Sequence, residues 1–96
     1  MNTIVLRLLV TNSSTNEQGF ILFDALQQAQ NNDEPVILHI DSDLPMSSSF
    51  LNTSIGKFLD TYGIIRFKEI VKFKGSKSQF LKLTDYIQKY KELYLV

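Results

Sequence analysis

Apolar residues occur along the chain in short runs separated by longer amphipathic stretches, and this pattern predicts the order of the secondary structure. Nearly unbroken apolar runs at residues 3–10 and 36–40 are typical of strands inside a parallel sheet. Residues 64–75 alternate apolar and basic positions and indicate a third strand, with a turn of helix or a bulge at residues 65–69 as the alternative.

Between and after these runs, apolar positions recur at spacings of three and four, which is typical of helices with one buried side. The pattern predicts one helix at residues 17–31, a second that opens on the serines at 47–49 and ends at Gly63, and a third at residues 76–93. The expected buried stripes are Gly19, Leu22, Phe23, Leu26 and Ala29; Leu51, Ile55, Phe58, Leu59 and Tyr62; and Phe80, Leu83, Ile87, Tyr90 and Tyr94. Phe20 and Ile21 lie off the first stripe, and we expect core packing for them rather than a contact surface.

The alternation of strands and helices predicts an α/β fold, and right-handed crossovers make the strands mostly parallel. We expect a sheet of three or four strands. A fourth strand would require residues 64–74 to split into two. The 96 residues form one domain, residues 1–96, with enough apolar content for a single core.

Composition excludes several kinds of site. The chain has no cysteine and one histidine, so we expect no disulfide and no zinc site. Asp41 and Asp43 could hold a magnesium ion, but two loop acids more often form turns, and we expect no metal or cofactor. No apolar run approaches the roughly 20 residues of a membrane span, and no signal peptide is evident, so we expect a cytoplasmic protein without membrane association. The net charge is zero, but the acidic residues dominate the first half and the lysines the second.

The segment between the second strand and the second helix carries the strongest functional signal. Asp41 to Pro45 reads as a loop, and the serines at 47–49 fall at the start of the helix. Backbone N–H groups at a helix start lack partners within the helix and favour a serine cap or an anion, including a phosphate carried on a serine. The alternative is that one serine caps the helix and the other two only fill space.

The strand, the acidic loop and the sequence Ser47-Ser48-Ser49-Phe50 resemble the STAS-like family of small bacterial domains, relatives of the STAS anti-sigma-factor antagonists. In the antagonists the motif is roughly Asp-Ser-Ser-Gly-Leu, and a partner anti-sigma kinase phosphorylates its second serine. The resemblance places Ser49 on the phosphorylated position and Ser48 on the other serine. Ser47 stands in place of the acidic residue, so that Asp41 or Asp43 would have to supply the charge, and Phe50 stands in place of the glycine.

The resemblance implies a sheet with helices covering mainly one face, as in STAS domains. It also implies a non-enzymatic regulatory domain that binds a protein partner such as a histidine-kinase-like ATPase. Ser49 and Ser48 are the phosphorylation candidates, and catalytic residues are not expected. The partner is expected to dock on the loop and the start of the second helix, through Asp41, Asp43, Met46, Ser47 and Phe50.

Two other classes of function remain open. A constitutive interaction or assembly protein would use Phe20, Phe50 or the basic segment at residues 66–77. A nucleic-acid-binding module, which we do not expect, would use the same basic segment, with Phe67 and Phe73 stacking on bases. An enzyme is not expected, because the chain lacks a phosphate-binding loop and a credible catalytic triad, and His39 is expected to be a hydrogen-bonded core residue.

Overall fold

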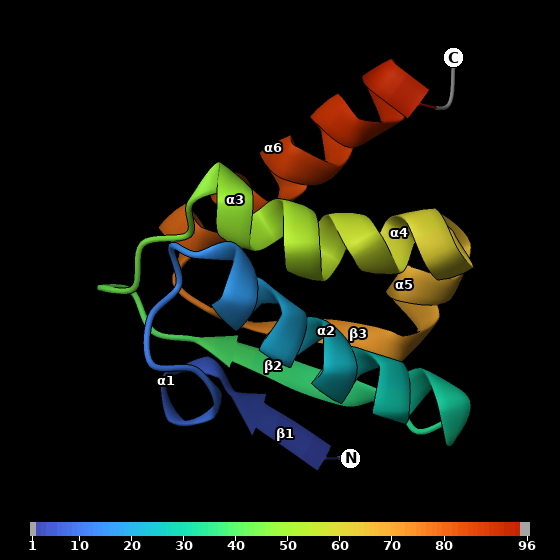
Figure 1. The fold of residues 1–96 in the computed structure, drawn as a ribbon, viewed down its shortest axis with the longest axis horizontal. Coiled ribbons are helices and arrows are strands. Elements are labelled where there is room, and N and C mark those ends of the chain that lie inside the picture. Colours follow the sequence, from blue (N-terminus) through green and yellow to red (C-terminus); the bar gives the residue numbers. More distant parts are fainter. Residues whose placement is uncertain (1, 95–96) are drawn as a thin grey trace.

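A computed structural model describes residues 2–94 and shows an α/β fold with a three-stranded parallel sheet (Figure 1). The strands are β1 (Asn2–Val5), β2 (Val36–Ile40) and β3 (Val71–Gly75), and β2 lies between the other two. Ile37 is the register partner of Thr3 on one side and of Lys72 on the other. The predicted fold class is therefore confirmed, with the sheet three strands wide.

The first strand is shorter than predicted. It ends at Val5, and α1 (Leu6–Leu9) follows as a single turn of helix. This turn places Leu6 in the core, where its side chain is fully buried. An apolar run of this length does not distinguish a strand from a buried helical turn, which explains the error.

The first long helix, α2 (Asn16–Asn31), is close to its predicted bounds. Thr15 caps it, because its side chain accepts a hydrogen bond from the backbone N–H of Gln18 at 3.4 Å. All the residues of the predicted stripe are buried. Phe20 and Ile21 are 44% and 39% exposed, so the expectation that they pack in the core is wrong. The Lys57 ammonium lies 5.1 Å from the centre of the Phe20 ring and covers part of it.

The second predicted helix consists of α3 (Ser48–Leu51), a π-helical segment η1 (Asn52–Gly56) and α4 (Lys57–Tyr62). Four residues of its predicted stripe are buried, Tyr62 is half-buried against the same core, and Gly63 ends the helix at a φ of 90°, a conformation that favours glycine. Within the π-helical segment, the buried hydroxyl of Ser54 donates to the Phe50 carbonyl at 2.7 Å. This bond satisfies the buried Ser54 hydroxyl.

The third predicted strand is half helix. Residues Ile64–Ile70 form α5, and only Val71–Gly75 belong to β3, so the helical alternative is right and extends further than expected. The last helix, α6 (Lys77–Tyr94), is capped by Ser76, whose side chain accepts from the Gln79 N–H at 3.2 Å. The side chain of Tyr94, assigned to the stripe of this helix, lies outside the described residues.

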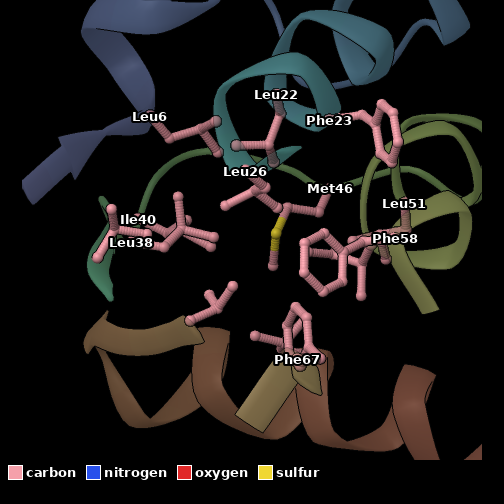
Figure 2. Close-up of a cluster of buried hydrophobic side chains, with 14 of the residues drawn as sticks. Leu6, Leu22, Phe23, Leu26, Leu38, Ile40, Met46, Leu51, Phe58 and Phe67 are labelled. Carbon is pink, nitrogen blue, oxygen red and sulfur yellow. The ribbon is translucent and has the colours of Figure 1, made fainter. Parts of the chain in front are cut away.

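The helices cover one face of the sheet, as predicted. Figure 2 shows side chains of the sheet and of the helices in one cluster, among them Leu38 of β2, Leu22 and Leu26 of α2, Phe58 and Phe67. The opposite face carries the intervening strand residues: Thr3, Val5, Ile37, His39, Lys72 and Lys74. These side chains are exposed or half-buried, and we call this surface the open sheet face. Within residues 2–94, no helix has the length and apolar character required to cross a bilayer.

Candidate functional site

The loop that follows β2 is held in shape by a side chain from the last helix. Gln79 of α6 is buried, and its amide donates to the carbonyl of Asp41 at 2.8 Å and to that of Leu44 at 2.6 Å. A third, longer contact of 3.4 Å reaches the Ser42 carbonyl. One buried amide therefore fixes the path of residues 41–44.

The two loop carboxylates lie together on the surface and share one arginine. The Arg7 Nε atom is 2.6 Å from an Asp41 oxygen, and a second guanidinium nitrogen contacts Asp43. The hydrogen bond from Arg7 holds the pKa of Asp43 below its ordinary value, assisted by a backbone hydrogen bond within Asp43. Arg7 thus neutralises part of the negative charge of the acidic loop.

His39 is not the core histidine that the sequence suggested. Its side chain is 32% exposed on the open sheet face, and its Nε2 atom lies 3.4 Å from Asp41 Oδ1. The reason is that β2 is covered on one side only, so the alternate residues Ile37 and His39 face outwards.

A second set of contacts joins this loop to the segment before α2. The buried hydroxyl of Ser13 donates to the Pro45 carbonyl, and the Ser13 carbonyl accepts from the Ser47 N–H at 3.1 Å. The Ser47 hydroxyl also donates to the Ser14 carbonyl at 2.9 Å. These bonds fix the position of Ser47 before the helix begins.

Of the serines at 47–49, only Ser47 caps the helix. It has an extended backbone, and its Oγ accepts a hydrogen bond from the Phe50 N–H at 3.1 Å. Ser48 and Ser49 are exposed in the first turn. Neither of their hydroxyls has a hydrogen-bond partner among residues 2–94. The fold therefore uses Ser47 and leaves the two phosphorylation candidates accessible.

Ser48 lines a hollow of about 320 Å³ between the start of α3 and the second half of α6. Asn52, Tyr86 and Lys89 also line it, and the Tyr86 hydroxyl is 2.7 Å from Asn52 Oδ1. The Lys89 ammonium is paired with Asp85 of its own helix at 3.1 Å. An anion on Ser48 would thus lie on a surface that already contains a cation and hydroxyl groups.

Two of the expected partner contacts belong to the core instead. Met46 is 3% exposed and Phe50 is fully buried, so their side chains do not form part of the surface that a partner would meet. Both lie next to turn or cap residues, but their apolar side chains fill the space between the sheet and the helices. Asp41, Asp43 and Ser47 keep at least part of their surface exposed.

The basic segment is also less available than the sequence suggested. Arg66 contacts Asp33 at 2.8 Å and Glu69 at 3.5 Å, which holds the pKa of Arg66 above its ordinary value, chiefly through the hydrogen bond with Asp33. Phe67 is buried in α5 and cannot stack on a base. Lys72 and Lys74 remain exposed on the open sheet face.

The sequence interpretation missed the residues that hold the site together, namely Arg7, Ser13 and Gln79. Arg7 carried one usable signal, because it is the only basic residue among the first 50 and the loop after β2 is acidic. For Ser13 and Gln79 the sequence offered no local signal, since both act on carbonyl groups more than 30 residues away.

Searches of protein-family models, of curated proteins and of solved structures found no match to this chain.

Proposed function

We propose that the chain is a non-enzymatic regulatory domain that binds a protein partner, and that phosphorylation of Ser49 or Ser48 controls this binding. The supporting observation is that the three serines differ in their hydrogen bonds. Ser47 alone supplies the helix cap, whereas the hydroxyls of Ser48 and Ser49 are exposed and serve no structural bond among residues 2–94. A kinase could therefore modify either serine without removing a contact that the fold needs.

A phosphate at this position would act on the surface rather than on the fold. It adds roughly −1.5 to −2 charges at the start of a helix, where the dipole favours negative charge. The loop before it is fixed by Gln79 and Ser13, so the modified side chain would be presented from a rigid base. A partner surface suited to neutral serines would lose affinity through repulsion and through desolvation of the phosphate.

The resemblance to STAS-like domains suggests a histidine-kinase-like ATPase as this partner. Its docking surface would comprise the exposed parts of Asp41, Asp43 and Ser47 together with Ser48 and Ser49. The Arg7 pair makes this surface a mixture of both charges, so that we expect recognition by hydrogen bonds as well as by charge.

The direct test is gentle capture of the tagged protein from its native host, followed by mass spectrometry of phosphosites and bound chains. Phosphate on Ser48 or Ser49 together with a copurifying ATPase would support the proposal. The captured partner is then titrated calorimetrically with Ser49→Asp, Ser49→Ala and the corresponding Ser48 variants. We expect the aspartate variants to bind more weakly and the alanine variants to bind like the unmodified protein. Equal affinities of all four variants would overturn the switch.

A second candidate is constitutive docking on the open sheet face. Parallel sheets are usually covered on both faces, whereas here Ile37 lies half-buried beside the exposed Lys72, and Val5 lies half-buried in β1 beside His39. The affinity of a partner bound there would be unchanged in the serine variants and would decrease when Lys72 and Lys74 are both replaced by glutamate. The calorimetric series therefore separates the two candidates.

A further inference from the structure

A groove with a volume of about 480 Å³ lies between α5, β3 and α6, separate from the serine site. Its walls are apolar and come from all of these elements, chiefly Phe67, Val71, Phe73, Leu83 and Ile87. The volume falls within the range of about 300–1,000 Å³ that is usual for small-molecule sites.

The mouth of this groove keeps a large apolar side chain in contact with solvent. Phe80 of α6 lines the groove and is 48% exposed, and its ring lies 5.7 Å from that of Phe73. The exposure of Phe80 is unexpected from the helical stripe, which predicted it to be buried. A ligand in the groove would cover this ring and remove apolar surface from water.

The charged groups that line the groove are both basic. Lys72 donates from its ammonium to the carbonyl of Lys68 at 2.7 Å, which holds the cation at the rim and leaves two of its N–H donors available. Within residues 2–94, neither the Lys72 nor the Lys68 ammonium has a carboxylate within ion-pair distance. The groove therefore combines an apolar interior with uncompensated positive charge at its edge.

We propose that this groove binds a small anionic amphiphile, that is, an aliphatic chain with a carboxylate or phosphate at one end. The chain lies among Phe67, Leu83 and Ile87, and the anionic group meets the ammonium groups of Lys68 and Lys72. The proposal does not depend on the serine switch, because it uses a different surface and different residues.

The test is an NMR titration of the ¹³C-methyl-labelled protein with decanoate, decyl phosphate and decanol, each below its aggregation concentration. Decanoate or decyl phosphate is expected to shift the methyl signals of Val71, Leu83 and Ile87. Lys68→Gln removes a cation that makes no hydrogen bond, and it is expected to lower the affinity for the anionic ligand by about threefold to tenfold. The matched control is Lys74→Gln, on the open sheet face of β3, which should leave the affinity unchanged.

The ligand series shows which head group is recognised. Tighter binding of decanoate than of decanol supports a carboxylate head group. Tighter binding of decyl phosphate than of decanol supports a phosphate head group. Equal binding of decanol and both anions, or equal effects of Lys68→Gln and Lys74→Gln, would overturn the proposal. Methyl shifts that depend on protein concentration without ligand would also overturn it, because a second copy of the chain would then occupy the groove.

Discussion

Ser47 is the serine whose loss should cost stability. Ser47→Ala removes the acceptor for the Phe50 N–H and the donor to the Ser14 carbonyl. We expect a decrease of about 1–2 kcal/mol in the free energy of unfolding, the usual cost of losing a helix cap. Urea unfolding followed by circular dichroism measures this difference.

The neighbouring serines provide matched controls in the same turn. Ser48→Ala and Ser49→Ala should change the free energy of unfolding by less than about 0.5 kcal/mol, because both side chains are exposed and unbonded. A loss at Ser48 or Ser49 as large as that at Ser47 would show that the cap is shared, and it would weaken the argument for an available phosphosite.

The pairing of Arg7 with Asp43 predicts a pH dependence. Because Arg7 lowers the pKa of Asp43 in the folded protein, the stabilisation is fully present above the ordinary aspartate pKa of about 3.9. It decreases as the pH falls below that value and through the lower pKa of the folded state. NMR titration of the Asp43 carboxyl carbon should show this low pKa, and Arg7→Gln should raise it, whereas Lys74→Gln should not. An Asp43 pKa that is unaffected by Arg7→Gln would contradict the pairing.

At single residues, the sequence predicted the local role of a side chain better than it predicted the distant residues that this side chain contacts. A serine cap at the start of the second helix was predictable, because cap preference is local. That Ser47 caps the helix, and not Ser48 or Ser49, depends on hydrogen bonds between Ser47 and the segment before α2, more than 30 residues away. The burial of Met46 and Phe50 likewise follows from tertiary packing in the core, and no local pattern contains that information.

At the scale of elements, α2 and the π-helical segment pack so closely that Gly19 has no room for a side chain. A Cβ atom there would lie 1.8 Å from Thr53 Oγ1 and 2.6 Å from the Phe50 carbonyl oxygen. Gly19→Ala should therefore lower the free energy of unfolding by about 1–3 kcal/mol, although alanine favours helix formation. Thermal or urea unfolding tests this, with Gln28→Ala at an exposed position of the same helix as the control. A stabilised Gly19→Ala protein would show that the two helices can separate without cost.

Elements with a long, regular period were predictable, and short apolar runs were not. The stripe of α2 extends over several turns, and β2 is a run of five apolar or half-buried residues between clear turn signals. Residues 6–9 and 64–70 form helix where strand was predicted. In both cases a few apolar residues fit either structure, and tertiary packing decides which one forms.

For the whole molecule, the sequence predicted the α/β class, because the connections between strands are long and helical, whereas the placement of the helices on one face was expected from the resemblance to STAS domains. It did not predict how different the two faces of β2 would be. The run from Val36 to Ile40 looked apolar on both sides, yet only Val36, Leu38 and Ile40 are buried. The other side remains available for the second candidate function.

This one-sided layering can be measured with two neighbouring substitutions in β2. Leu38 is buried under the helices, whereas Ile37 lies on the open sheet face. Leu38→Thr should lower the free energy of unfolding by about 3–5 kcal/mol through lost packing and a buried hydroxyl. Ile37→Thr keeps the β-branched shape and should cost less than about 1 kcal/mol. Urea unfolding at several protein concentrations gives both values. Similar costs at both positions would show that the second face is buried in solution, and a cost at Ile37 that grows with protein concentration would mean that another copy of the chain covers it.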